Sequence, residues 1–292
     1  MGSELKVRFW GTRGLISAPG PGQQKYGGNT PCIQLIYKNH IIIIDTGWGV
    51  SDLGETLMPR ITQSKEALTV HIFYTHFHWD HIQGLPFFHP IYFPSSTLNI
   101  YSPAPADLTH RNLDQLFDGS YSPFAGIDSM PSKINMIPLR GLIRIDGLDI
   151  DYCVTDHGEA YRDGAQSQSF AYRFNDRDSH SRVVVVTDHE ARIGESNAAV
   201  VRFAKHCDLL IHDAQYNDEE YAKHLGWGHS SVRLSLENAL KIQAKRVLLT
   251  HHDPSRTDVE IDKMSAEFKG HEQLGKLNFE FAKEGEIYEV PT

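Results

Sequence analysis

The chain has 292 residues, 40% hydrophobic and 22% charged, so it is long enough to bury a substantial core. Its 28 Lys and Arg against 37 Asp and Glu give a net charge of −9, and no global basic field favours a nucleic-acid backbone. The cysteines Cys32, Cys153 and Cys207 form no CxxC pair, which argues against disulfides or a cysteine zinc site and fits a reducing cytoplasm. No apolar run has membrane-spanning length, and no charged-then-apolar leader is seen. The unusual feature of the composition is its 17 histidines.

The first half of the chain is rich in strand patterns. Strands are predicted over 6–10, 32–37, 40–45, 68–74 and 98–101, and a helix over about 107–117. Lys38-Asn39 joins two of these strands as a hairpin, and the Gly/Pro-rich stretch 18–22 predicts a loop.

Strands and helices alternate in the second half. Strand patterns over 134–154 are broken by turns, and 170–174 and 182–187 predict a hairpin. Helices are predicted over 198–206, 230–244 and 257–268, with strands at 208–212, 247–250, 278–281 and 287–290. No repeat or linker divides the chain. We therefore expect one domain over residues 1–292, of the α/β class, with sheets inside and helices outside.

The segment Thr75-His76-Phe77-His78-Trp79-Asp80-His81 directly follows a predicted buried strand. In an extended backbone His76 and His78 point the same way and can bind one ion, while Asp80 and His81 can turn towards a second. Imidazole and carboxylate ligands without thiolate suit zinc, manganese or iron. The alternative is a chance grouping among the histidines, with odds of roughly under one in a hundred on composition alone.

Three later residues stand at the ends of predicted strands and could complete two metal sites: His157, Asp188 and His251. A carboxylate between two cations is a natural bridge, which is the role we expect for Asp188. Taken singly, each of the three could also be a solvated loop residue.

The segment 75–81, followed along the chain by His157, Asp188 and His251, resembles the metal-binding motifs of the metallo-β-lactamase superfamily. The fold of that superfamily is a four-layer αββα sandwich. The resemblance covers nearly the whole chain. Segments 11–14, 44–47, 209–214, 229–231 and 249–251 resemble its ribonuclease Z-like branch. One departure is Thr187-Asp188-His189-Glu190, where that branch usually has Gly-Asp; we assign His189 and Glu190 no role.

The resemblance implies two divalent ions, with zinc expected and manganese or iron as alternatives. One would be held by His76, His78, His157 and Asp188, and the other by Asp80, His81, Asp188 and His251. By the same resemblance, His229 acts near the leaving group, and Asp45 and Asp213 support the ligands from behind. Without these roles, Asp45 would simply belong to the turn at a strand end, and His229 would be a histidine at the start of a helix.

Two adjacent cations would lower the pKa of a bridging water and produce hydroxide. Asp80 could orient or deprotonate that water, and His229 could protonate the departing alkoxide as a general acid. In the tRNA 3′-processing endonuclease of this branch, an arm for tRNA normally lies between the third histidine and the bridging aspartate. Here only 31 positions separate His157 from Asp188, and 161–187 reads as loop and hairpin, so the arm is missing and a small substrate is expected.

Segments 11–14, 26–30 and 251–256 are most similar to cyclic-nucleotide phosphodiesterases of the superfamily, including anti-Pycsar nucleases. The resemblance implies a cyclic-nucleotide substrate opened to a nucleoside monophosphate, a cytoplasmic homodimer, no membrane partner and a lesser role for nucleic acid. Arg13, Asn29 and Arg256 are candidate substrate contacts, although such residues are more often surface groups.

Several alternatives to a cyclic-nucleotide phosphodiesterase stay open from the sequence. A tRNA 3′-processing endonuclease or a thioesterase or lactonase would use the same ligands, and the segment His229-Ser230 argues against the last two. A flavodiiron-type protein would need Glu in place of His78 and a flavin domain. A non-catalytic scaffold usually loses ligands, and none is lost here.

Overall fold

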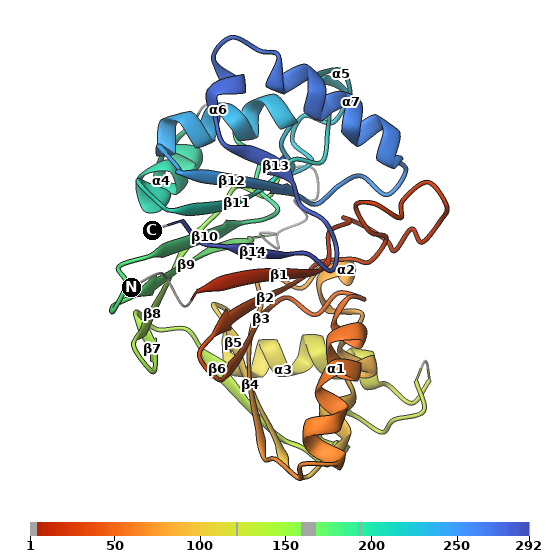
Figure 1. Ribbon diagram of the computed structural model, residues 1–292. Coiled ribbons are helices and arrows are strands. Elements are labelled where there is room, and N and C mark those ends of the chain that lie inside the picture. The colour runs from red at the N-terminus through yellow and green to blue at the C-terminus, as the bar shows by residue number, and fades with distance from the viewer. Residues whose placement is uncertain (1–4, 121, 159–167, 193, 292) are drawn as a thin grey trace.

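The computed structural model describes residues 5–120, 122–158, 168–192 and 194–291 (Figure 1). Within these ranges the strands form two seven-stranded sheets, ordered β14-β1-β2-β3-β4-β5-β6 and β13-β12-β11-β10-β9-β8-β7. Neighbours from β3 to β6 and from β10 to β13 are parallel, and the remaining pairs are antiparallel.

The first sheet contains β1 (Lys6–Gly11), β2 (Cys32–Tyr37), β3 (His40–Ile44), β4 (Leu68–Phe73), β5 (Ser96–Ser102), β6 (Lys133–Pro138) and β14 (Ile287–Glu289). The second contains β7 (Ile143–Ile145), β8 (Leu148–Val154), β9 (Phe170–Asp176), β10 (Arg182–Val186), β11 (Leu209–Asp213), β12 (Arg246–Thr250) and β13 (Phe279–Phe281). The helices are α1 (Val50–Thr62), α2 (Trp79–Ile82), α3 (Ala106–Asp114), α4 (Glu195–Ala204), α5 (Asp218–Lys223), α6 (Val232–Ile242) and α7 (Asp258–Lys269). Short 3-10 turns lie at Leu85–Phe87, His89–Tyr92, Gln115–Phe117, Ile127–Ser129 and Leu274–Lys276.

The elements form four layers. Helices α1 and α3 lie beside the first sheet, whereas α4, α6 and α7 lie beside the second (Figure 1). One hydrophobic cluster fills the space between the sheets, and two others lie between each sheet and its own helices. The expected four-layer αββα sandwich is therefore confirmed.

The longest apolar runs form central strands that are buried on both faces. In β3, Ile42 and Ile44 pack between the sheets, while Ile41 and Ile43 pack against α1. The four valines 183–186 of β10 divide between two cores in the same way. Burial of both faces explains why these strands are continuously apolar instead of alternating.

The predicted strands and both hairpins are confirmed, with bounds that differ by a few residues; part of the predicted loop, 159–167, lies outside the described residues. Three helices have no counterpart in the prediction: α1, α2 and α5. The sequence of α1 contains Gly54 and Pro59, and its N-cap Gly49 offers no side-chain cap, so the local signals for a helix are weak. Burial of Leu53, Leu57 and Ile61 against the first sheet compensates for them.

No helix in the described ranges is long and apolar enough to cross a membrane. All three cysteines are free thiols, with Cys32 and Cys207 buried and Cys153 partly buried.

Candidate metal centre

The site lies where the carboxyl ends of strands from both sheets meet. Asp45 follows β3, Asp188 lies just beyond β10, and His251 follows β12. All three adopt left-handed backbone conformations, with φ of 59°, 51° and 62°, which each cost about 1–3 kcal/mol for a residue other than glycine. Such strain is common at functional sites, and here it accompanies each turn from a strand end into the site.

The histidine motif leaves β4 through Thr75. His78 is extended, with φ −64° and ψ 153°, and is the N-cap of α2, whose single turn carries Asp80 and His81. His76, Asp80 and His81 are at most 6% exposed, whereas His78 is exposed. One short segment therefore brings four ligand-type side chains to the same place.

Asp188 lies at the centre of the cluster. Its Oδ1 is 3.8 Å from His76 Nε2, 3.7 Å from His157 Nε2 and 3.4 Å from His251 Nε2. Its Oδ2 is 3.2 Å from His81 Nε2. The structure thus places Asp188 between two ligand groups, His76-His78-His157 and Asp80-His81-His251.

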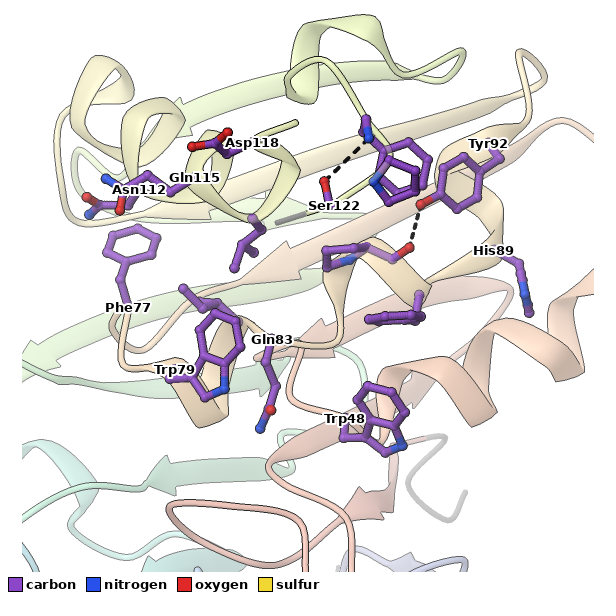
Figure 2. Close-up of a pocket in the computed structure, with 16 residues that line it drawn as sticks. Trp48, Phe77, Trp79, Gln83, His89, Tyr92, Asn112, Gln115, Asp118 and Ser122 are labelled. Carbon is purple, nitrogen blue, oxygen red and sulfur yellow. Dashed lines mark hydrogen bonds between the residues drawn. The ribbon is translucent and has the colours of Figure 1, made fainter. Parts of the chain in front are cut away.

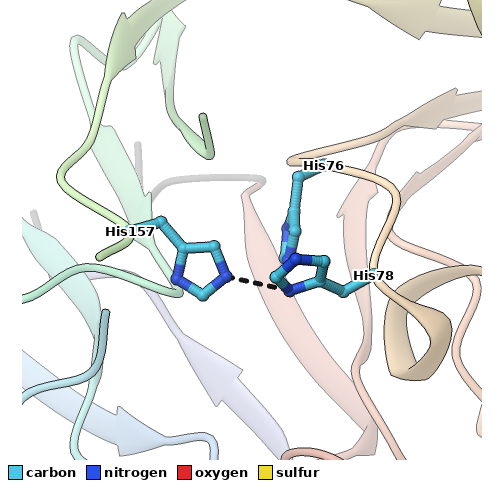
Figure 3. Close-up of side chains that lie close together, drawn as sticks. All are labelled: His76, His78 and His157. Atoms are coloured by element: carbon cyan, nitrogen blue, oxygen red, sulfur yellow. Dashed lines mark hydrogen bonds between the residues drawn. The ribbon is translucent and has the colours of Figure 1, made fainter. Parts of the chain in front are cut away.

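Figure 3 shows the first group, in which His76 and His78 come from the motif and His157 from the segment after β8. His157 Nε2 is 3.0 Å from His78 Nδ1. Two nitrogens that bind one zinc at about 2.0–2.1 Å lie about 3.3 Å apart in tetrahedral geometry, so this spacing fits a shared ion.

Several buried polar atoms of the cluster have no hydrogen-bond partner within the protein, as suits a cation site. These atoms are His76 Nε2, His81 Nε2, His251 Nε2 and Asp188 Oδ2. Buried polar groups rarely lack a partner. Ring nitrogens and a carboxylate oxygen that lie close together with free lone pairs suit a metal ion.

In three histidines of the cluster the other ring nitrogen already has a hydrogen-bond partner. His76 Nδ1 donates to Thr75 Oγ1 at 3.0 Å, and His251 Nδ1 donates to Gln215 Oε1 at 3.1 Å. His157 Nδ1 donates to the carbonyl of Gly228 at 3.1 Å. Each bond fixes the tautomer that leaves the Nε2 lone pair available to a cation.

Asp45 supports the motif from behind. It accepts the Thr75 N–H at 2.8 Å, the Thr75 hydroxyl at 2.7 Å and His81 Nδ1–H at 2.8 Å. Burial raises the pKa of Asp45, while His81 opposes that shift. A single buried carboxylate therefore positions two neighbours of the ligand cluster.

Charges within the cluster shift its titration strongly. Burial alone would lower the pKa of His251, but Asp188, Asp80 and Asp213 raise it to about 9. Burial would raise the pKa of Asp188, yet the surrounding histidines hold it well below its ordinary value. Burial dominates at His157 and lowers its pKa to about 4. The cluster therefore keeps its carboxylates ionised, and a divalent cation would replace the protons they attract.

His229 lies beside the ligands with its Nδ1 held by a carboxylate. Nδ1 is 2.7 Å from Asp213 Oδ2, and Asp213 Oδ1 accepts the Ser230 N–H at 2.9 Å. The His229 ring stacks on His251 with centroids 4.8 Å apart and is only 5% exposed. Because Asp213 occupies Nδ1, Nε2 is the nitrogen that can exchange a proton with a substrate.

The three candidate substrate contacts all have partners within the protein. Arg13 is 0% exposed and donates to the carbonyl groups of Gly27, Asp253 and Arg256, so it braces loops instead of facing solvent. Arg256 is paired with Glu220. Asn29 donates to Asp52 and Glu284. In the structure their polar atoms hold the loops around the site together, and substrate contact by Arg13, Asn29 or Arg256 stays a prediction.

Sequence reasoning missed two residues that shape the site. Gln215 orients His251, and Gly14 lies so close to that ring that a Cβ would come within 2.2 Å of Cε1. Gly14 belongs to a segment already singled out by pattern, whereas an isolated glutamine two residues after a strand carries no such signal.

An aromatic pocket of about 1010 Å³ is lined by two residues of the motif but by none of its ligand candidates (Figure 2). Phe77 and Trp79, which alternate with the ligands, line it together with Trp48, Phe87 and the amides of Gln83 and Asn112. Trp79 is 61% exposed and stands between His78 and Asp80 in the chain. The same short segment thus builds the ligand cluster and one wall of the pocket.

Comparison with known proteins agrees with the fold. The model of the β-lactamase superfamily domain matches residues 40–252, a range that contains every ligand candidate. Ribonuclease Z of Thermoplasma volcanium is 26% identical, and the alignment covers 92% of this chain and 94% of that protein. Yeast PDE1, solved without ligand, has a TM-score of 0.72 at 18% identity, covering 99% of this chain and 100% of that one. A diphosphatase from the PhnP family has a TM-score of 0.67 at 18% identity, covering 98% of each chain.

The chain belongs to the β-lactamase superfamily and is a hydrolase with the metallo-β-lactamase fold.

Proposed function

We propose that the protein is a phosphodiesterase that opens small cyclic nucleotides to linear nucleoside monophosphates. The observation that carries the proposal is the position of His229, held by Asp213 at 2.7 Å, beside two ligand groups with Asp188 close to both. This arrangement pairs a cation site with a proton donor, as the departure of an alkoxide requires.

His76, His78, His157 and Asp188 would hold one cation, and Asp80, His81, Asp188 and His251 the other. When bound, the cations supply Lewis-acid activation of water and neutralise charge on the phosphate. Asp80 accepts the Leu15 N–H at 2.8 Å, which fixes one carboxylate oxygen and leaves the other to orient the attacking water. His229 would deliver a proton from Nε2 to the leaving oxygen while Asp213 keeps its ring in place.

A small substrate is supported by the length of the segment between His157 and Asp188. The hairpin of β9 and β10 already takes 170–186 of that interval, and the net charge of −9 gives no broad field for a long nucleic acid. The exposed Trp79 ring, which stands between His78 and Asp80 in the chain and lines the aromatic pocket, offers a surface on which a nucleobase could stack.

Further features belong to the same proposal. Zinc suits a set of imidazoles and carboxylates without sulfur. We take residues 1–292 as one hydrolase domain, because the ligands come from both sheets. A homodimer is the form expected from the resemblance to cyclic-nucleotide phosphodiesterases, and three free thiols fit a reducing cytoplasm.

A tRNA 3′-processing endonuclease is the second candidate. The similarity to ribonuclease Z of Thermoplasma volcanium along 92% of the chain favours it. A thioesterase of the same fold is less favoured, because a thiolate leaves without the proton that the Asp213–His229 pair could supply. A lactonase also releases an alkoxide, and only the resemblance of the His229-Ser230 segment to the ribonuclease Z-like branch argues against it.

The deciding experiment compares substrates side by side with metal-loaded protein at physiological salt. We expect turnover of 2′,3′- or 3′,5′-cyclic nucleotides to exceed processing of precursor tRNA. Efficient cleavage of the tRNA, with no turnover of any cyclic nucleotide, would establish the endonuclease instead.

A further inference from the structure

Glu190 is a fully buried carboxylate that the mechanism above does not use. It stands two residues after Asp188 and is 0% exposed. Its Oε1 accepts the Tyr221 hydroxyl at 3.0 Å and the Gly226 N–H at 3.0 Å, and its Oε2 accepts the Gly228 N–H at 3.2 Å. Burial of a carboxylate is costly unless hydrogen bonds compensate for it, so these three donors fix its position.

The loop that Glu190 holds leads directly into His229. Gly226 and Gly228 have φ of 82° and 88°, conformations that favour glycine. A Cβ on Gly228 would lie 2.6 Å from His157 Nδ1, so the loop backbone packs directly against that ligand. The Gly228 N–H donates to Glu190, while the carbonyl of the same residue accepts His157 Nδ1–H.

The backbone of Glu190 adds a second connection. Its N–H donates to the carbonyl of Asp156 at 2.7 Å, immediately before His157. One residue therefore links the segments that carry Asp188, His157 and His229, although its carboxylate contacts none of these three side chains directly.

We propose that Glu190 is a positioning residue that sets the orientation of His157 for its cation and the placement of His229. The proposal rests on the proposed metal-dependent hydrolysis. A purely structural carboxylate that stabilises the fold without affecting the site is the competing explanation, and the test must separate the two.

The first variant is Glu190→Gln, which keeps the shape of the side chain but turns one acceptor into an NH₂ donor facing a backbone or phenol donor. We expect the affinity for one Co²⁺ per chain, measured by chelator competition, to fall about 10- to 100-fold. The d–d absorption of the remaining Co²⁺ should shift, because the His157 ring loses its fixed orientation. On a cyclic nucleotide we expect kcat to fall by a similar factor with little change in KM.

Asp176→Asn is the matched control. Asp176 is 3% exposed, accepts hydrogen bonds from Tyr37 and Ser179, and lies at the end of β9 outside the ligand cluster. This variant should lower the melting temperature while leaving the Co²⁺ affinity and spectrum unchanged.

If Glu190→Gln does not fold, Gly226→Ala tests the same connection. Its Cβ would meet nothing within 4 Å, so only the strained backbone of the loop changes. A smaller loss of Co²⁺ affinity in the same direction is expected.

Wild-type Co²⁺ affinity and spectrum in either variant, with only a lower melting temperature, would overturn the proposal. Because these two readouts need no substrate, they stay decisive even if the wild-type protein hydrolyses no phosphodiester, which would count against the proposed function alone.

Discussion

His229 and His251 stack face to face, yet their surroundings suit them to different roles. The Nδ1 atom of His229 lies against the carboxylate of Asp213, whereas Nδ1 of His251 lies against the amide oxygen of Gln215. His251 Nε2 is one of the buried atoms without a hydrogen-bond partner, as expected of a ligand. For a single histidine, the group that contacts Nδ1 therefore decides whether Nε2 acts as a proton donor or as a metal ligand.

His229→Ala should therefore retain both cations but lower kcat by roughly 10²- to 10⁴-fold on a cyclic nucleotide, the range for loss of a general acid. The loss should be much smaller with bis(p-nitrophenyl) phosphate, because p-nitrophenolate leaves without a proton. Metal analysis and steady-state kinetics check both points. His110→Ala, which removes an exposed histidine paired with Asp128, is the control expected to change neither. Equal losses on both substrates would remove His229 from the acid role.

The elements around the site are held by close backbone contacts as well as by side chains. Gly14 donates its N–H to the carbonyl of His252 at 3.0 Å, and its Cα faces the ring of His251. The Gly-rich N-terminal segment is thus a wall of the ligand cluster.

Gly14→Ala should push the His251 ring away from its position, since the new Cβ would come within 2.2–2.9 Å of three ring atoms. We expect weaker binding of one cation and at least a tenfold loss of kcat, with a melting temperature close to wild type for the metal-free protein. Gly22→Ala in the same segment is the control, because its Cβ would meet only Thr257 Cγ2 at 3.4 Å. Identical metal titrations for the two variants would show that this contact does not position His251.

The predictability of the elements follows from how much of their stability is local. Runs such as Ile41–Ile44 and Val183–Val186 predict strands because β-branched residues dominate them and both faces become buried. Helix α1 could not be predicted in this way, since Gly54 and Pro59 weaken its local pattern and its packing against the first sheet supplies the stability.

For the molecule as a whole, acid should destabilise the metal-free fold. Burial lowers the pKa of His212 to about 4, against about 6.5 in the unfolded chain. Between these values the unfolded chain binds a proton that the folded chain does not, so the free energy of unfolding falls as the pH falls from 6.5 to 4. His212 alone would contribute on the order of 3 kcal/mol to that loss.

Urea denaturation of metal-free protein at several pH values between 7 and 4 measures this effect. His212→Asn cannot take up the proton and should give a shallower dependence on pH, whatever its stability at pH 7. A variant whose unfolding free energy falls with pH as steeply as that of wild type would exclude His212 as a source of acid sensitivity.

The ligand positions could be predicted because one motif and three strand ends carry them along the chain. Among the residues that orient them, Asp45 is expected from the resemblance and does hold His81. Gln215 and the carbonyl of Gly228 could not be predicted, because they reach His251 and His157 only through tertiary packing. The burial of Arg13 could not be predicted either: a cation in a glycine-rich segment predicts a phosphate contact, whereas in the fold its guanidinium donates to three carbonyl groups.

Metal analysis of exhaustively dialysed protein tests most directly whether Asp188 bridges two cations. We expect close to two divalent ions per wild-type chain. Asp188→Ala should retain less metal than any single substitution among the histidine ligands, because Asp188 lies 3.2–3.8 Å from ligand atoms of both groups. An unchanged metal content in Asp188→Ala would contradict the bridging role and, with it, this account of the site.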